Sequence, residues 1–367
     1  MINLIKSLFQ KQSQQQIEEQ KQLSPNSYKH FNYKTINKNI IKQKSDCLAI
    51  AINIDNSLLL VSHESRIKVY RLKNEQLKQV QLIINCCKRV TAIKFFNKYS
   101  QSYISSSKDS NIIISSSYLC ANPKYIQKLQ GNSQGMTNFI INIEEDVIVS
   151  CSLDSIIRFW NRNTSSNISS WICSQTIQDH SSYVEGLSIN DQSNTVITCG
   201  FDSCILIIQR KNSQFKWLLT QKIHFHAFSH QIIFINDNTF AFQDLSLSKL
   251  QIYQNINENN QSPNYIKIQE VVLEGINNGN KSYFSSIFNH KKQVLVYKHG
   301  NTINFLRVII KKKTKQKRDL LFRLEQAIDY GQLFFGFIVG TLSEDGQYFI
   351  TWDELSQQIQ LKKYMEL

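Results

Sequence analysis

The sequence predicts an all-β fold built from similar units of several short strands. The stretch from Ser150 to Trp160, S-C-S-L-D-S-I-I-R-F-W, follows a β-branched run and indicates a strand, a tight polar turn and a second strand. The same frame recurs with its acidic residue at positions 64, 109, 154 and 202, so the steps are 45, 45 and 48 residues. A fixed period of about 45 residues is typical of a repeat array whose units are small sheets.

The recurring frame resembles the WD40 repeat. Trp160-Asn161 stands at the dipeptide position of that repeat, and His180 precedes Asp202 by 22 residues, which is the family's usual distance within one unit. The resemblance covers the chain from about residue 33 to its end; it is clear in four units and faint in three. It implies a β-propeller of four-stranded blades around a central channel.

The chain length predicts seven blades. There are 323 residues from 45 to 367, and division by seven gives about 46, whereas six blades of 45 residues would leave 53 residues unplaced. A four-stranded blade cannot bury both of its faces alone, so a closed ring in which each blade packs on two neighbours is favoured.

Each unit can be placed along the chain. Strands are expected at 48–54, 58–62 and 66–72 in the first unit, and at 90–95, 102–106, 111–115 and 125–129 in the second. The third unit holds the reference stretch and ends with 171–177, and the fourth runs from 183 to 223. The last three units diverge, with Leu247 and Gly300 at the acidic positions of the fifth and sixth. In the seventh, 342–351 resembles the turn between the first two strands, and 359–362 is the expected third strand.

The two ends of the chain are expected to meet. The seventh unit lacks a fourth strand, and residues 33–41 look like an isolated strand before the first repeat. We therefore predict that residues 28–367 form the propeller and that 33–41 complete the last blade, which removes an exposed edge. Residues 1–27 are expected to be a tail with a short amphipathic helix, because Ile2, Ile5, Leu8 and Phe9 follow helical spacing. This tail either lies on the propeller or docks a partner.

Composition and cysteine content indicate in which compartment the protein is expected. Lys and Arg number 42 against 28 Asp and Glu, and the net charge of +14 favours solubility and weak attraction to anionic surfaces. Eight cysteines include no C-x-x-C, and Cys151 and Cys199 fall in predicted inner strands, which indicates buried thiols in a reducing compartment. No apolar run reaches the roughly 18 residues of a spanning helix. We expect an intracellular, cytoplasmic protein, with the nucleus as the alternative.

The acidic residues of the frame are predicted to be structural. An Asp side chain in a tight turn accepts backbone N–H bonds and fixes the turn. The predicted turn and blade residues are Glu64, Asp109, Asp154, Trp160, His180 and Asp202. The resemblance implies a hydrogen-bonded network of Asp, His, Ser or Thr, and Trp, but the fourth unit has Ile208 at the Trp position and the third has no His near Asn132. We therefore expect packing rather than polar networks to hold the blades.

Two clusters leave alternatives open. His224, His226 and His230 form H-x-H-x-x-x-H, which fits a loop on the propeller face or, alternatively, a metal site. Six of the eight residues from Lys311 to Arg318 are basic. This run predicts a solvated hairpin tip, with a nuclear-localisation signal or an anionic-partner contact as alternatives. No stacking aromatics interleave it, so sequence-specific nucleic-acid binding is not expected.

The sequence contains no recognisable catalytic motif. Gly-rich phosphate loops, a nucleophile elbow, H-E-x-x-H and Ca²⁺ loops are missing from it. We predict a non-catalytic scaffold without a cofactor that binds other proteins, with the residues preceding the turn carboxylates as contact candidates: His63, Lys108 and Phe201. One alternative is a WD40 component of cytosolic iron–sulfur cluster assembly, because W-I-C-S-Q-T-I-x-D-H followed by Y-V-x-x-L is similar to that subfamily. The other is a propeller enzyme or a metal-site protein.

Overall fold

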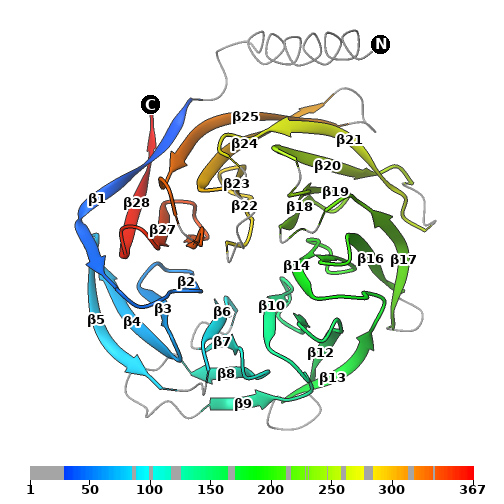
Figure 1. Ribbon diagram of the computed structural model, residues 1–367, viewed down its shortest axis with the longest axis horizontal. Coiled ribbons are helices and arrows are strands. Elements are labelled where there is room, and N and C mark those ends of the chain that lie inside the picture. The colour runs from blue at the N-terminus through cyan, green and yellow to red at the C-terminus, as the bar shows by residue number, and fades with distance from the viewer. Residues whose placement is uncertain are drawn as a thin grey trace.

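Seven four-stranded antiparallel sheets form a closed ring in the computed structural model (Figure 1). All regular secondary structure in the described part of the chain is β-strand, so the predicted all-β class and seven-bladed ring are confirmed. The structure describes residues 29–84, 88–98, 102–116, 125–163, 170–211, 216–227, 229, 231–245, 247–257, 262–276, 284–312, 318–333 and 335–367.

The first six blades follow one another along the chain, and each runs from an inner strand at the channel to an outer strand at the rim (Figure 1). Blade 1 consists of β2 (Ile50–Ile52), β3 (Leu58–His63), β4 (Arg66–Lys73) and β5 (Gln76–Ile83); blade 2 of β6 (Val90–Phe95), β7 (Ser102–Ser107), β8 (Ile112–Ser116) and β9 (Tyr125–Leu129); blade 3 of β10 (Met136–Ile141), β11 (Val147–Ser152), β12 (Ile157–Asn163) and β13 (Ser170–Ile177). Blade 4 consists of β14 (Val184–Ile189), β15 (Thr195–Gly200), β16 (Cys204–Lys211) and β17 (Lys216–His224); blade 5 of β18 (Ile232–Asn236), β19 (Thr239–Gln243), β20 (Lys249–Asn255) and β21 (Tyr265–Val272); blade 6 of β22 (Ile287–Asn289), β23 (Val294–His299), β24 (Thr302–Lys312) and β25 (Arg318–Asp329).

Blade 7 joins the two ends of the chain. It consists of β26 (Ile338–Leu342), β27 (Tyr348–Asp353), β28 (Gln358–Glu366) and, as its outer strand, β1 (Phe31–Lys42). β1 pairs antiparallel with β28 from Phe31 opposite Glu366 to Lys42 opposite Gln358. The prediction that residues 33–41 complete the last blade is confirmed, whereas the predicted N-terminal helix lies outside the described residues.

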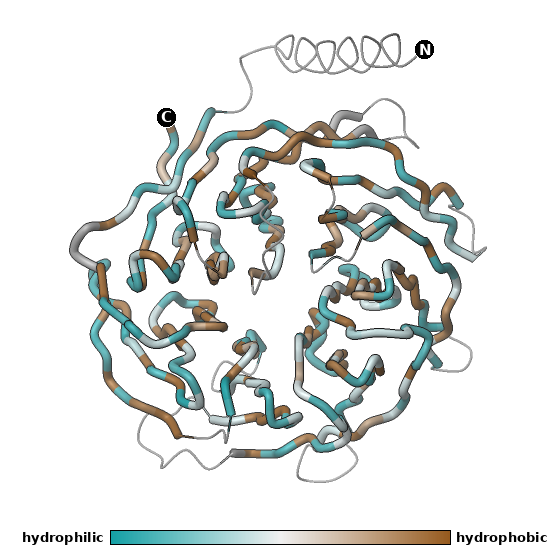
Figure 2. The backbone as a smooth tube through the Cα atoms, in the orientation of Figure 1, coloured by the Kyte–Doolittle hydropathy of each residue, from teal (hydrophilic) through white to brown (hydrophobic). Residues whose placement is uncertain are grey.

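Burial explains the composition of the strands. The second strand of a blade is covered on both faces, and all six residues of β11 and all six of β15 are buried. Such strands read as continuous runs of β-branched and small residues. Outer strands such as β13 expose most of one face, and apolar and polar residues alternate along the rim (Figure 2). The core is therefore a set of layers between neighbouring blades.

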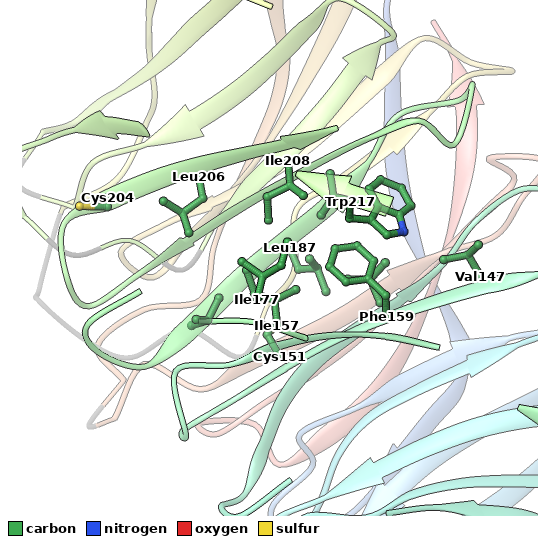
Figure 3. Packing of buried hydrophobic residues seen from close by; sticks show 13 residues of the cluster. Val147, Cys151, Ile157, Phe159, Ile177, Leu187, Cys204, Leu206, Ile208 and Trp217 are labelled. Carbon is green, nitrogen blue, oxygen red and sulfur yellow. The ribbon is translucent and has the colours of Figure 1, made fainter. Parts of the chain in front are cut away.

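The layer between blades 3 and 4 illustrates this packing. Phe159 of β12 stacks on Trp217 of β17 with ring centroids 4.7 Å apart, and both side chains are buried. Figure 3 shows these rings beside Ile208, Leu187 and Val147, which come from both blades. Stacked aromatic pairs add about 0.5–1.5 kcal/mol beyond the area that they bury.

Aromatic rings and a buried carboxylate hold β1 against blade 6. Tyr33 stacks on Phe305 of β24 with ring centroids 4.9 Å apart. Glu325 of β25, whose side chain is fully buried, accepts from Arg307 at 3.2 Å and lies 2.8 Å from His30 Nδ1. Arg307 also donates to the carbonyl oxygen of Lys29. Through these contacts the first described residues pack against blade 6, which closes the ring.

A repeated glutamine joins the outer strands of neighbouring blades. Gln127 of β9 donates to the carbonyl oxygen of Trp171 and accepts from its N–H, both at 2.8 Å. The same two-bond arrangement occurs in three further pairs: Gln175 with Trp217, Gln221 with Tyr265, and Gln326 with Tyr33. The last pair spans the ring closure, so one device serves both ordinary blade contacts and the seam.

Candidate interaction face

The turns between second and third strands and the connections between blades meet at one end of the ring. The backbone N–H of Lys108 donates to Arg89, that of Phe201 to Tyr183, and that of Glu354 to Phe337, each at 2.9–3.0 Å. In every case a turn is bonded to the connection that enters the same blade. We call this end of the ring the turn face.

Asp154 organises the turn face of blade 3. Its carboxylate accepts from the backbone N–H groups of Ile156 at 3.0 Å and Ser133 at 3.1 Å, and it pairs with Arg158 at 2.9 Å. Burial opposes its charged form, but hydrogen bonds from Arg158 and Ser152 prevail and lower the pKa of Asp154 to about 2. Arg158 supplies the cation that sequence reasoning missed, although it stands four residues after Asp154 in the recurring frame.

Trp160 and Asp109 occupy blade positions of the predicted kind. Trp160 is buried and donates from Nε1 to the hydroxyl of Ser150 at 2.9 Å. Asp109 accepts from the N–H of Asn111 at 3.2 Å and from the hydroxyl of Ser107. The turns of Asp154 and Asp109 thus both contain the local side-chain-to-backbone bonds that favour Asp there.

Blade 4 holds a buried polar network. His180 Nδ1 lies 2.8 Å from Asp202, and its Nε2 lies 2.8 Å from the hydroxyl of Thr198. Asp202 also accepts from the N–H of Ser181 at 3.1 Å, which ties the connection to the turn. Burial opposes the charged form of Asp202, but the hydrogen bond and charge interaction with His180, together with backbone hydrogen bonds, lower the pKa of Asp202 overall. The expectation that packing replaces polar networks therefore does not hold for this blade.

Blade 5 places aromatic rings at the corresponding positions. The N–H of His226 donates to Asp244 at 3.2 Å, as Ser181 does to Asp202, so Phe225 takes the place of His180. Phe225 contacts Phe242 edge to face with centroids 4.6 Å apart, and Phe242 in turn contacts Tyr253. The expectation that Leu247 replaces the turn carboxylate is wrong. Asp244, directly after β19, accepts the connecting N–H instead.

In blade 7 a buried lysine makes the hydrogen bond to the second strand. Lys362 of β28 donates to the hydroxyl of Thr351 at 2.7 Å, and the hydroxyl of Tyr330 donates to the same oxygen at 3.2 Å. Burial lowers the pKa of Lys362 to about 8. The lysine thus makes the polar link to a second-strand hydroxyl that Trp160 makes in blade 3.

The turn of blade 1 departs from the frame that the spacing suggested. Blade 1 has a two-residue turn between His63 and Arg66, in which Glu64 adopts a φ of 56°. The backbone of Glu64 contacts Asp46 and Val90, so Glu64 and not His63 is the counterpart of Lys108 and Phe201. Because this turn is shorter than that of blade 3, the spacing misaligned the two.

Glycine at the acidic position of blade 6 has a steric cause. Gly300 has a φ of +54°, and a Cβ atom there would lie 1.8 Å from the carbonyl oxygen of Ile276. The connection approaches the turn too closely for any side chain, so no carboxylate can occupy this place.

The contact candidates differ in exposure. Lys108 is exposed on the turn face, whereas Phe201 is half-buried and meets Tyr183 edge to face with centroids 6.0 Å apart. Tyr183 exposes 46% of its surface. His63 lies at the end of β3, half-buried, and burial together with Lys68 lowers the pKa of its imidazole. Of the three candidates, Lys108 is therefore exposed, whereas Phe201 and His63 are each half-buried.

Blade 7 adds apolar residues that the sequence analysis missed. Phe335 and Leu355 expose 55% and 62% of their surfaces, and Phe335 stacks on Phe337 with centroids 5.5 Å apart. Glu354 accepts the backbone N–H groups of Phe335 and Phe337 at 3.0–3.1 Å. The run L-F-F-G-F in the connection from blade 6 was the available signal.

The predicted histidine and lysine clusters are only partly described. His224 Nδ1 lies 3.2 Å from the thiol of Cys204, and His230 lies outside the described residues. No three His, Cys, Asp or Glu side chains in the described part of the chain could share a metal ion. Residues 313–317 of the basic run also lie outside it. Where the structure is described, no helix has the length and apolar character needed to cross a membrane.

Comparison with known proteins agrees with the geometry. The family profile of the WD domain, G-beta repeat (WD40), matches residues 123–161 and 171–209. Each match spans the outer strand of one blade and the first three strands of the next, namely β9 to β12 and β13 to β16. Two matched repeats within a ring of seven four-stranded blades support a WD40-repeat β-propeller. A search of curated proteins found no match. WD40 propellers are generally scaffolds for protein interactions.

Proposed function

We propose that this propeller is a non-catalytic scaffold that binds other proteins through its turn face. The observation that carries the proposal is the aromatic pair Tyr183 and Phe201, which is partly exposed on two bonded segments of blade 4. Tyrosine and phenylalanine are enriched at the centres of protein interfaces, where a few such side chains supply most of the binding energy.

The surroundings of this pair favour a preformed site. Phe201 precedes Asp202, whose carboxylate is held by His180 and by the N–H of Ser181 beneath the surface. Leu153, half-buried in the adjacent turn of blade 3, is bonded to its own connection through Gly135. A surface fixed by backbone bonds loses little conformational entropy on binding.

Proximity labelling with the full chain in its native cell tests this proposal. We expect Tyr183→Ala with Phe201→Ala to lose most of the labelled partners, because the aromatic anchor is removed. The matched control is Ile172→Ala, an exposed apolar residue on the rim strand β13. An unchanged partner set in the double variant would rule out this part of the face. The triple variant of His63, Lys108 and Phe201 separates the aromatic contribution from the other two candidates.

The iron–sulfur alternative stays a prediction. The residues that suggested it have structural contacts here: Trp171 and Ile177 are buried, and Gln175 joins two blades. Co-purification with cytosolic cluster-assembly factors tests it. An intracellular location also stays a prediction, as does the metal-site alternative, which a zinc titration of the His224, His226 and His230 variants would test.

A further inference from the structure

The turn face is divided into two sectors of different charge. In blades 3 and 4 its segments, residues 130–135, 153–156, 178–183 and 201–203, contain no Lys or Arg. The sector around blades 1 and 2 carries six exposed cations. We call it the basic sector: Lys42, Lys44, Arg66, Lys88, Arg89 and Lys108.

Backbone bonds show that the basic sector is continuous. The N–H of Gln43, between Lys42 and Lys44, donates to Gln357 in the blade 7 turn at 2.8 Å. The N–H of Val90 donates to Glu64 at 2.9 Å. The N–H of Lys108 then donates to Arg89 at 2.9 Å. One surface therefore runs from the turn of blade 7 across blade 1 to the turn of blade 2.

Four of these six cations, all but Arg89 and Lys108, have no counter-ion among the described residues. Arg89 pairs with Asp46 at 2.9 Å. Among the residues that the structure describes, no carboxylate pairs with Lys42, Lys44 or Arg66, nor with Lys88. Unpaired cations grouped on one surface create a positive potential that attracts an anionic partner.

An apolar patch borders the basic sector at blade 7. Leu355 lies two residues before Gln357, the residue bonded to Gln43, and it exposes 62% of its surface. The stacked pair of Phe335 and Phe337 belongs to the connection that is bonded to the same turn through Glu354. A contiguous apolar patch rimmed by charge is typical of an interaction site.

We propose that the basic sector binds an acidic peptide segment of a partner protein, with one aromatic or aliphatic anchor on Phe335 and Leu355. This rests on the proposed scaffold function and assigns it a partner chemistry. The anchor supplies the buried apolar contact, and the acidic residues that follow it neutralise the cations of blades 1 and 2. The aromatic rings lie together at one end and do not alternate with the cations, so a peptide fits this surface better than a single-stranded nucleic acid does.

Selection of short random peptides displayed on phage against the purified full-length chain tests the proposal. The enriched peptides are then synthesised, and their affinities are measured by fluorescence anisotropy at low and at high salt. Four multiple variants are compared with the wild type: Lys42→Glu with Lys44→Glu and Arg66→Glu; Phe335→Ala with Leu355→Ala; Tyr183→Ala with Phe201→Ala; and, as the matched control, Lys78→Glu with Lys128→Glu and Lys211→Glu, which are exposed lysines of β5, β9 and β16. Thermal unfolding verifies that each variant is folded.

We expect the enriched peptides to be acidic and to contain one aromatic or large aliphatic residue. Their affinity should fall at least about tenfold in the turn-face charge reversal and at high salt, because exposed charge pairs are screened. It should fall in Phe335→Ala with Leu355→Ala and stay unchanged in the rim control.

Three other results would overturn the inference. Neutral or basic peptides whose binding needs Tyr183 and Phe201 would refute the acidic chemistry while leaving the scaffold proposal intact. Peptides insensitive to every turn-face variant would refute both. An oligonucleotide that binds the wild type more tightly than the peptides, and loses binding in the same charge reversal, would replace the peptide by a nucleic acid.

Discussion

Blades 4 and 5 are neighbours whose corresponding turns are stabilised by different side-chain interactions. In blade 4, His180 bridges Asp202 and Thr198, whereas blade 5 fills the corresponding space with Phe225 and Phe242. Both keep a carboxylate that accepts the backbone N–H of the incoming connection. The carboxylate bond to the main chain is thus the common requirement, and the side chains beneath it can form either a hydrogen-bonded network or an aromatic cluster.

The largest loss of stability is expected from truncation of Phe242, the second-strand residue of blade 5 that corresponds to Thr198 of blade 4. Phe242→Ala should lower the free energy of unfolding by about 3–5 kcal/mol, because a fully buried ring leaves a cavity. Thr198→Val keeps the volume and removes one hydrogen bond from His180, so it should cost about 1–2 kcal/mol. Denaturant unfolding of both variants measures this, and a larger cost for Thr198→Val would contradict the comparison.

The shared carboxylate is tested by matched amide substitutions. Asp202→Asn and Asp244→Asn should each cost about 1–3 kcal/mol, because both weaken the bond to the connecting N–H. Calorimetric unfolding of the two variants gives the comparison. If Asp202→Asn destabilised the protein and Asp244→Asn did not, the equivalence of the two turns would be lost.

Acid should weaken the polar turns selectively. The folded-state pKa of Asp154 is about 2, below its ordinary value of 3.8, so its charge adds stability above pH 3.8 that is lost as pH falls towards 2. Screening by solvent near the protein surface limits this contribution to on the order of 1–2 kcal/mol. Between these pH values the wild type should lose more stability than Asp154→Asn, and parallel pH profiles would refute this account of the turn.

The glutamine links between outer strands should have an effect no larger than that of the Asp154 charge. Gln175→Ala removes two hydrogen bonds to Trp217 and should cost about 1–2 kcal/mol. Gln134→Ala, an exposed glutamine of the connection into blade 3, is the control and should be neutral. Equal stability of both variants would show that the links merely accompany the packing of Trp217.

The ring and its closure could be read from the sequence because both follow from regular spacing. The period identified the blades, and the missing fourth strand of the seventh unit identified the role of β1. Register within the turns could not be read in this way. The two-residue turn at Glu64 and the earlier position of Asp244 change the local spacing. Counting residues from one blade to the next therefore assigned the acidic position to the wrong residue.

Some residues that occupy the same place in different blades cannot be matched from the sequence. Phe225 and Lys362 replace residues of different chemistry, and only the structure shows which positions correspond. The four glutamines that join blades carry a visible signal, since each precedes an aliphatic residue by two positions, as Gln81 and Gln269 also do. The role of these glutamines could not be predicted, because the sequence does not reveal which backbone groups of the next blade they bond to.

Lysine cross-linking of the protein with its native partners, followed by mass spectrometry, tests most directly whether the turn face is the binding surface. The account predicts intermolecular cross-links concentrated at Lys42, Lys44, Lys88 and Lys108 on the turn face. Cross-links concentrated instead at the rim lysines Lys78, Lys128 and Lys211 would contradict it.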